Sequence, residues 1–367
     1  MIYLDHGATS LHKPKTVTAA MVRAVRCCGN PGRGGHDAAD AAAKVVYGCR
    51  ERAGALFGCQ PEQVVFTANC THGLNIAIHS LVKPGARVVI SGFEHNAVTR
   101  PLYALGAKVH VAGRKLFDQA DTLECFEKAL KAGQDAAVFT HVSNVFGYIL
   151  PVAEIAALCR RYGVPFAVDA AQSAGFLPVE PESWGADFVA MPGHKGLLGP
   201  QGTGLLLCRK IPQPLLFGGT GSNSAEAAMP EFLPDRLEAG TLNVPGIAGL
   251  DAGMAYVQRL GLAHIFSRSA NAAAQCAKGL ADRDIAVFSG TPQAGTLSFQ
   301  TRMDVEAAAD KLARKGIALR AGLHCAPLAH ESAGTGDRGT LRLSFGHDAC
   351  GCQIWAFLQA IDSCGIR

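Results

Sequence analysis

Short apolar runs rich in β-branched residues alternate, along most of this chain, with longer segments whose apolar residues recur at helical spacing. We predict strands at seven of these runs: residues 63–67, 86–92, 107–113, 136–142, 165–171, 187–193 and 202–210. A stretch between them such as "VAEIAALCRRYG" is apolar at helical spacing and ends in a glycine, as amphipathic helices do. The alternation predicts an α/β fold, with a large domain built on a mostly parallel, seven-stranded sheet covered by helices on both faces.

The pattern changes near residue 250. A long helical segment, "IAGLDAGMAYVQRLG", is followed by three strand-like runs, "IAVFSG", "GTLSFQT" and "GTLRLSFG", which are mixed with helices. We interpret this part as a smaller α+β domain with a less parallel sheet, and we expect the extreme N-terminus to pack with it. The predicted division is 15–250 for the large domain, and 1–14 together with 251–367 for the small one.

Composition narrows the classes of function. Hydrophobic residues make up 49% of the chain and charged residues 17%, as in a well-buried globular protein. The net charge is +4 and no run of lysine or arginine is dense, which argues against nucleic-acid or membrane partners. The start, "MIYLDHGATSLHKP", is charged where a signal peptide is apolar, and no apolar run is long enough to cross a bilayer. We therefore expect a cytoplasmic protein.

The thirteen cysteines are irregularly spaced and include no C-x-x-C pair. In a cytoplasmic protein we expect such thiols to be reduced. They also lack the regular spacing of a four-ligand zinc site, so no metal site is predicted. Cys350 and Cys352 are expected at the start of the last helix and receive no role.

The stretch "AMPGHKGLLGPQGTG", residues 190–204, places Lys195 behind a histidine and inside a run of glycines. A phosphate-binding P-loop requires glycine before the lysine and Ser or Thr after it, whereas His194 and Gly196 stand there. The dinucleotide fingerprint G-x-G-x-x-G is also absent after the early strands. The sequence therefore favours neither a P-loop nucleotide site nor a Rossmann dehydrogenase.

Five predicted strands run into polar residues: "ANCTHG", "FEHN", "SNVFG", "AQSAG" and "HKG". Ligands of α/β sheets bind beyond the carboxyl ends of the strands, so these residues are expected to converge. Pyridoxal phosphate requires such a set: a lysine for the Schiff base, a carboxylate for the pyridine nitrogen, a donor for the ring oxygen and a helix N-terminus for the phosphate. Asp169 stands 26 residues before Lys195, which suits strand ends one βαβ unit apart.

At this point the sequence resembles a known family. "VDAAQ" followed by "GHKGLLGPQGTG", with "FEHNAV" and "HVSNVFG" upstream, is similar to the class V aminotransferase-like enzymes of pyridoxal phosphate fold type I. Among these enzymes, cysteine desulfurases and selenocysteine lyases resemble it most. The resemblance runs from "YLDHGATS" to "LRLSFG", and "RAGLHCAP", residues 320–327, resembles the desulfurase loop that carries the sulfur-accepting cysteine.

The resemblance implies pyridoxal phosphate as cofactor and assigns the residues around its ring. Lys195 would bind the cofactor covalently and, once released, move the Cα proton of the substrate. Asp169 would pair with the protonated ring nitrogen, and Gln172 would hydrogen-bond the phenolic oxygen. His95 would stack on the ring and assist proton transfer.

The phosphate site implied by the resemblance lies at a helix start. Thr71 and the backbone around Cys70 would hold the phosphate with His194 beside it, and Thr241 would reach the cofactor of a neighbouring subunit. Two residues depart from the family pattern: Pro192 stands where relatives often have Ser or Thr, and Cys70 where many have Thr. Both changes remove hydroxyl groups from the phosphate site.

The same resemblance implies how substrate is bound and how sulfur moves. Asn144 and Arg342 would bind the carboxylate of L-cysteine. Cys325, as a thiolate, would attack the substrate sulfur and hold it as a persulfide while L-alanine leaves. We expect His324 and Arg320 to lower the pKa of this thiol.

The leading hypothesis is therefore a homodimeric, pyridoxal phosphate-dependent cysteine desulfurase. It would pass sulfur to an acceptor protein for iron–sulfur cluster or thio-cofactor synthesis. Selenocysteine lyase is the close alternative, because the same lysine and cysteine serve either chalcogen. A class V aminotransferase or epimerase is a more distant alternative, and a non-catalytic protein that retains the fold belongs to a different class.

Overall fold

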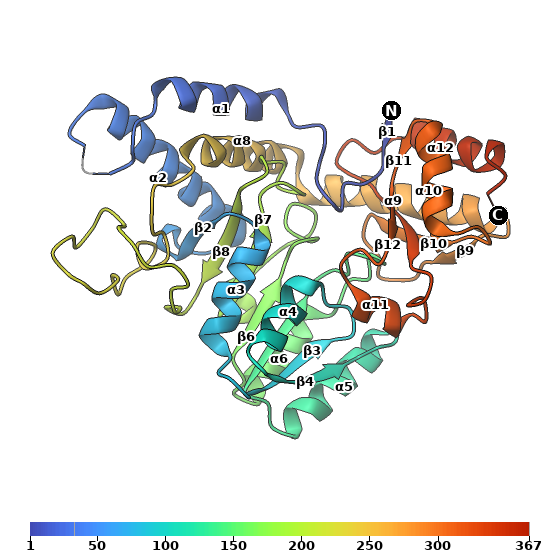
Figure 1. Ribbon diagram of the computed structural model, residues 1–367, viewed down its shortest axis with the longest axis horizontal. Coiled ribbons are helices and arrows are strands. Elements are labelled where there is room, and N and C mark those ends of the chain that lie inside the picture. Colours follow the sequence, from blue (N-terminus) through green and yellow to red (C-terminus); the bar gives the residue numbers. More distant parts are fainter. Residues whose placement is uncertain (33, 367) are drawn as a thin grey trace.

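The computed structural model describes residues 1–32 and 34–366, and its centre is a seven-stranded sheet (Figure 1). The strand order is β2-β8-β7-β6-β5-β3-β4; β8 runs antiparallel to its neighbours β2 and β7, and the other pairs are parallel. The strands are β2 (Val64–Thr67), β3 (Arg87–Ser91), β4 (Lys108–Ala112), β5 (Ala136–Thr140), β6 (Phe166–Asp169), β7 (Phe188–Pro192) and β8 (Gly204–Cys208). The predicted seven-stranded, mostly parallel sheet is confirmed.

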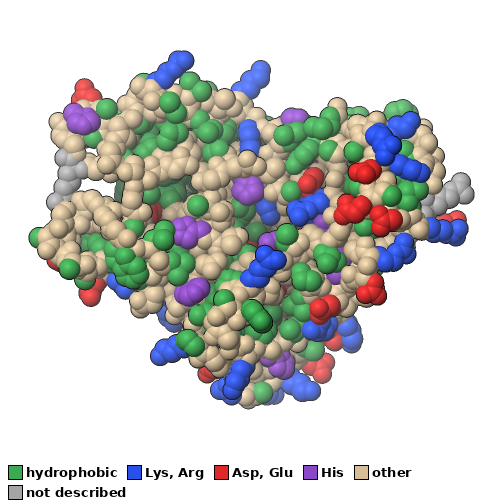
Figure 2. All heavy atoms as spheres, in the orientation of Figure 1, with side chains coloured by type: hydrophobic (Ala, Val, Ile, Leu, Met, Phe, Trp, Pro, Cys, Tyr) green, Lys and Arg blue, Asp and Glu red, His purple; other side chains and the backbone are tan. Residues whose placement is uncertain are grey.

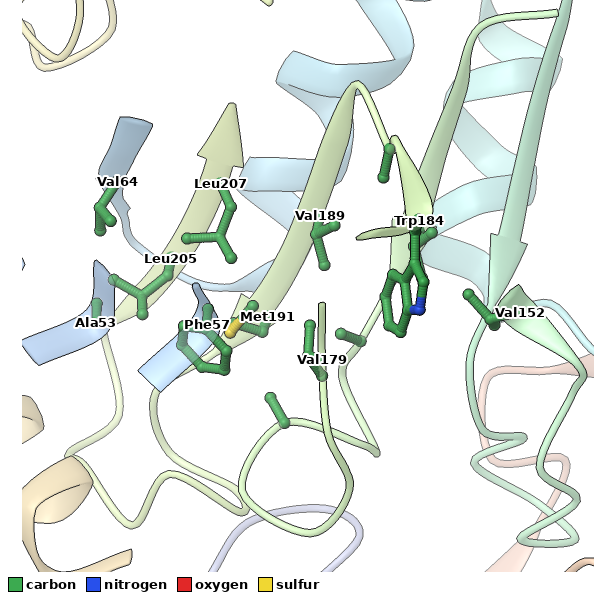
Figure 3. Packing of buried hydrophobic residues seen from close by; sticks show 14 of the residues in the cluster. Ala53, Phe57, Val64, Val152, Val179, Trp184, Val189, Met191, Leu205 and Leu207 are labelled. Atoms are coloured by element: carbon green, nitrogen blue, oxygen red, sulfur yellow. The ribbon is translucent and has the colours of Figure 1, made fainter. Parts of the chain in front are cut away.

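Helices cover both faces of this sheet. As a result, the side chains of its strands are buried on whichever face they point to. Val189 and Met191 of β7 pack on one face, and Ala190 between them packs on the other. Figure 3 shows Val189 and Met191 gathered with Phe57 on the first face. The helices of this part are α1 (Lys15–Cys27), α2 (Asp37–Phe57), a 3-10 turn (Pro61–Gln63), α3 (Cys70–Leu81), α4 (Asn96–Ala104), α5 (Gln119–Lys131), α6 (Val152–Arg161), α7 (Pro181–Trp184) and α8 (Val244–Leu260).

The rest of the chain folds around a second, four-stranded sheet in the order β12-β13-β10-β9, with all pairs antiparallel. Its strands are β9 (Ala286–Phe288), β10 (Thr296–Gln300), β12 (Arg320–Gly322) and β13 (Thr340–Ser344). The helices here are α9 (Leu262–Ala281), α10 (Val305–Arg314), α11 (Pro327–Ser332) and α12 (Gly351–Ser363). The three predicted strands are confirmed as β9, β10 and β13, whereas the pattern did not indicate the three-residue β12.

The N-terminus packs with this second part, as expected. β1 (Ile2–Tyr3) pairs in parallel with β11 (Ile317–Ala318). Residue 250 lies inside the continuous helix α8, so the domain boundaries at 14 and 250 stay a prediction. Within the described ranges, no helix combines the length and apolar character that a membrane span requires.

The cysteines differ from the expectation in one place. Cys350 and Cys352 lie at the start of the last helix, as predicted, but they are joined in a disulfide, so the expectation of fully reduced thiols is wrong for this pair. Sequence spacing gave no sign of it, because the bond depends on the turn that leads into α12. The other eleven cysteines of the described residues are free thiols.

Candidate active site

A cavity of about 100 Å³ lies at the carboxyl ends of the parallel strands. Eight of the predicted site residues line it: Cys70, Thr71, His95, Asn144, Asp169, Gln172, His194 and Lys195. They come from segments far apart in the chain, and parallel strand ends bring them to one edge of the sheet. The three other predicted residues, Thr241, Cys325 and Arg342, are not among those that line it.

Asp169 and Lys195 are an acid and a base in the lining of the cavity. Asp169 ends β6, is only 3% exposed, and accepts hydrogen bonds at Oδ1 from the backbone N–H of Ala171 (2.8 Å) and the thiol of Cys70 (3.4 Å). Burial raises the pKa of Asp169, while the Ala171 N–H and the charge of Lys195 oppose this shift. Burial also lowers the pKa of Lys195, which enlarges the fraction of neutral amine, the form that attacks a carbonyl carbon.

The start of α3 forms the next wall of the cavity. Asn69 caps this helix by accepting a hydrogen bond from the backbone N–H of His72 (2.9 Å), and Cys70 and Thr71 form its first turn. The free N–H groups and the dipole of a helix start favour a phosphate. The thiol of Cys70 is engaged with Asp169, so only the backbone of Cys70 is left for a phosphate. Thr71 supplies the hydroxyl group in this turn.

His95 caps α4 with its side chain facing the cavity. Nδ1 accepts a hydrogen bond from the backbone N–H of Ala97 (3.0 Å), so the proton of the neutral ring is on Nε2. Burial, together with the charge of Lys195, lowers the pKa of His95 to about 4. The ring is therefore neutral at physiological pH, and its flat face suits stacking on an aromatic heterocycle.

Glu94, next to His95, was not predicted from the sequence. It is fully buried, and its Oε1 accepts hydrogen bonds from the backbone N–H groups of Ser91 (3.3 Å) and Thr140 (2.9 Å). Burial raises its pKa to about 8. Because the carboxyl group joins the ends of β3 and β5, it fixes the turn that carries His95. The acidic residue in "FEHN" was the only signal, and its partner Thr140 belongs to a strand 46 residues away.

Residues 5–14, called the N-terminal strap from here on, contact two of the residues that line the cavity, a feature that sequence analysis also missed. The side chain of Gln172 donates from Nε2 to the carbonyl of Gly7 (3.0 Å). His194 Nδ1 lies 3.0 Å from Thr9 Oγ1 in a second hydrogen bond. The motif "DHGATS" contributed only to the family resemblance, because nothing local shows that the strap contacts residues about 165 to 185 positions away.

Arg342 and Asn144, predicted to bind a carboxylate, already have protein partners. The guanidinium of Arg342 donates from Nη2 to Asp5 Oδ1 (2.5 Å) and from Nη1 to the carbonyl of Asn144 (3.0 Å), while its buried Nε has no partner. The amide of Asn144 donates to the carbonyl of His324 (2.8 Å), and its Oδ1 is buried without a partner. Their role toward substrate stays a prediction: the free Nε–H of Arg342 is a donor for a carboxylate, whereas Oδ1 of Asn144 only accepts hydrogen bonds.

Cys325 is exposed on the loop that follows β12. Its φ is +57° and that of His324 is +50°, a left-handed conformation that costs energy in residues with a Cβ. The loop is held by the backbone N–H of Asn96, which donates to the carbonyl of Cys325 (2.8 Å). The guanidinium of Arg320 lies 3.7 Å from the sulfur. The thiol is therefore displayed next to α4, the helix that His95 caps.

The expectation that His324 lowers the pKa of Cys325 is wrong. His324 is 3% exposed and points away from the thiol, with Nε2 donating to the carbonyl of Thr340 (3.1 Å). Burial lowers the pKa of His324 to about 2, so the ring carries no charge that would stabilise a thiolate. Arg320 is the cation that contacts the sulfur.

Thr241 is exposed between β8 and α8 and lies apart from the Lys195 cavity. It lines a different cleft, together with Arg50 and Glu238, whose side chains form a buried ion pair. Thr241 therefore does not contribute to the Lys195 cavity of its own chain.

Comparison with known proteins agrees with this geometry. The aminotransferase class-V family profile matches residues 2–357. The chain belongs to the class V aminotransferase family. Members of this family depend on pyridoxal phosphate. Family membership and the sheet topology together confirm the predicted fold class, pyridoxal phosphate fold type I with a mostly parallel central sheet.

Relatives of this class V chain include probable cysteine desulfurases. That of Methanothermobacter thermautotrophicus is 32% identical, with 91% of this chain and 88% of the relative covered. That of Pyrococcus abyssi is also 32% identical, with 89% and 85% covered. The apo structure of a cysteine desulfurase from Thermococcus onnurineus NA1 has a TM-score of 0.92 and 31% identity, covering 99% of this chain and 94% of the other. Cysteine desulfurase CsdA from Escherichia coli, solved in an S-sulfonic acid form, has a TM-score of 0.88 at 27% identity, with 99% and 94% covered.

Proposed function

We propose that this protein is a pyridoxal phosphate-dependent cysteine desulfurase that converts L-cysteine to L-alanine and retains the sulfur on Cys325. The observation that carries the proposal is an exposed cysteine on a strained loop, tied through Asn96 to the helix that His95 caps. A class V aminotransferase has no use for a thiol at that place. The relatives named as cysteine desulfurases support the same reaction.

The residues of the cavity fit the cofactor. Asp169 has no ion-pair partner in the described part of the chain, and a protonated ring nitrogen would be its partner. Lys195 would hold the aldehyde carbon, His95 would cover the ring, and Thr71 with the start of α3 would hold the phosphate. Bound in this way, pyridoxal phosphate supplies an electron sink for carbanion chemistry at the substrate Cα.

The chain itself moves the proton and the sulfur. Lys195 Nζ accepts the proton from the substrate Cα, and its lowered pKa suits a general base. The Cys325 thiolate then attacks the substrate sulfur: the new S–S bond forms as the C–S bond breaks, and the carbon skeleton takes the bonding electrons. After reprotonation this skeleton leaves as alanine, and the persulfide stays on Cys325. Arg320 stabilises the anionic sulfur before and after transfer.

Turnover of L-cysteine tests the proposal. The purified holoenzyme, given L-cysteine and a thiol reductant, is expected to release sulfide and alanine in equal amounts. A parallel assay with L-selenocysteine, in which the same residues would transfer selenium, decides between desulfurase and lyase preference. Formation of 3-mercaptopyruvate from L-cysteine, with glutamate from added 2-oxoglutarate and no sulfide, would instead identify an aminotransferase.

We also propose a homodimer in which Thr241 contacts the cofactor phosphate of the partner subunit. The segment between β8 and α8 projects from the sheet and exposes large apolar side chains, a feature that favours an interface (Figures 1 and 2). The exposed residues are Ile211, Leu216, Phe217 and Phe232, and Phe217 is 76% exposed. Thr241 stands at the end of the same segment.

Phe217→Asp is expected to shift the protein from dimer to monomer, because a buried unpaired carboxylate opposes association. Sedimentation velocity would measure the mass, and visible absorbance would report the loss of cofactor that follows when Thr241 no longer reaches the partner. Trp355→Asp, at another exposed aromatic residue on α12, is the matched control. A wild-type protein that sediments as a monomer with full cofactor occupancy would rule the dimer out.

A further inference from the structure

A second cleft, of about 420 Å³, lies between the start of α1, the end of α8 and the turn after β13. We call it the basic cleft, and the histidines and charged residues that line it are His12, Lys13, Lys15, Arg259, His347 and Asp348. Figure 1 shows the first turn of α1 beside the end of α8, where the large sheet meets the helices of the second part. Ligand sites are often found at such junctions.

The positive charges of this cleft exceed the negative ones. Lys15 and Arg259 are exposed and form no ion pair among the residues that the structure describes. Asp348, the single acidic residue among the described lining residues, lies near His6 (3.5 Å) and His12 (3.4 Å), and its buried Oδ1 has no hydrogen-bond partner. Like charges in a concave surface repel one another, and an anion bound between them would relieve this repulsion.

We propose that the basic cleft binds a small phosphate-bearing anion, such as a diphosphate or a phosphate monoester. The planar guanidinium of Arg259 can bind two phosphate oxygens at once, and Lys15 adds a second cation. His347 lines the same cleft, and its buried Nδ1 has no partner in the described structure. Nothing in the proposed desulfurase chemistry uses these three residues.

The cleft is connected to the active site through Lys13. This side chain lines the basic cleft, yet its Nζ donates to the carbonyl of His194 (2.9 Å), the residue before Lys195. Burial lowers the pKa of Lys13 to about 8, so a nearby anion would hold it in the charged form. Binding in the cleft is therefore expected to order the N-terminal strap.

Titration with inorganic pyrophosphate tests the proposal. The holoenzyme, freed of excess cofactor, is titrated calorimetrically at constant ionic strength, and we expect saturable binding of one ion per chain. Arg259→Gln and Lys15→Gln are each expected to weaken it by about tenfold, the effect of losing one charge-assisted contact. Lys128→Gln removes the same charge from α5, outside the cleft, and is expected to leave the affinity unchanged.

Two further measurements separate specific binding from charge screening. Glycerol phosphate and malonate, in parallel titrations, distinguish phosphate chemistry from a general preference for anions. Hydrogen exchange of residues 5–14 is expected to slow with pyrophosphate in the wild type, but not in Arg259→Gln. The proposal is overturned if all three variants bind alike, if malonate binds as well as pyrophosphate, or if exchange in the strap does not change. The desulfurase assay is independent of all these results.

Discussion

Lys195→Ala is expected to lower the rate of alanine formation by about 10⁴-fold, because it removes both the covalent attachment of the cofactor and the base for the Cα proton. No other lysine lines the cavity among the described residues, so none can take over either task. Sulfide and alanine released in single-turnover and steady-state assays would measure the loss. The effect should be equal for L-cysteine and L-selenocysteine, since both reactions begin with the same proton.

The attachment itself is checked chemically. Borohydride reduction of the wild-type holoenzyme should leave a pyridoxyl group on the peptide that contains Lys195, detected by mass spectrometry. Lys128→Ala, on the exposed face of α5, is the control and should keep both the adduct and the rate. A wild-type adduct on a different peptide, or full activity in Lys195→Ala, would refute the assignment of the site.

Cys325→Ala is expected to abolish persulfide formation and to lower sulfide release about a thousandfold or more, because no nucleophile then receives the substrate sulfur. The visible absorbance of the cofactor should remain, since Cys325 lies outside the lining of the cavity that holds Lys195 and Asp169. Trapping with an alkylating reagent during turnover, followed by mass spectrometry, would measure the persulfide. Arg320→Gln should give a smaller loss, because it removes the cation that contacts the sulfur.

Cys27→Ala is the matched control, because Cys27 is also an exposed free thiol but belongs to α1. It should retain both the rate and the persulfide on Cys325. Desulfuration at the wild-type rate by Cys325→Ala would exclude this cysteine as the sulfur acceptor. Loss of cofactor absorbance in that variant would instead show that the loop supports the cavity.

Much of the site was predictable because its reactive side chains lie at or just after the ends of strands. Asp169 follows a buried apolar run, and Lys195 follows the next run of the same kind, so their convergence required only parallel pairing. The pattern could not show that the Cys70 thiol contacts Asp169, or that Glu94 joins two strands. Those contacts depend on the directions of side chains from segments far apart in the chain, which the one-dimensional pattern leaves open.

The surroundings of Arg342 and Cys325 were less predictable for a related reason. Arg342 pairs with Asp5, 337 residues away, because β1 pairs with β11 and Asp5 forms a parallel bridge with Ser344 at the end of β13. His324 turns toward Thr340 rather than toward the thiol, because two consecutive residues adopt a left-handed backbone. Short strands such as β11 and β12 also have too few residues to show the alternation of apolar and polar side chains that indicates a strand.

The sequence by itself determined the seven-stranded sheet, the edge at which its polar residues meet and the lysine–carboxylate pair. The reason is that the local spacing of apolar residues fixes which segments are buried and whether each is a strand or a helix. The tertiary structure decided which partner each polar side chain takes: the strap against His194 and Gln172, and the exposed thiol beside Arg320. It also produced the basic cleft, whose residues come from three separate segments. Such contacts arise only when segments distant in the chain pack together, since hydrogen bonds and charges act between atoms a few ångströms apart and not along the chain.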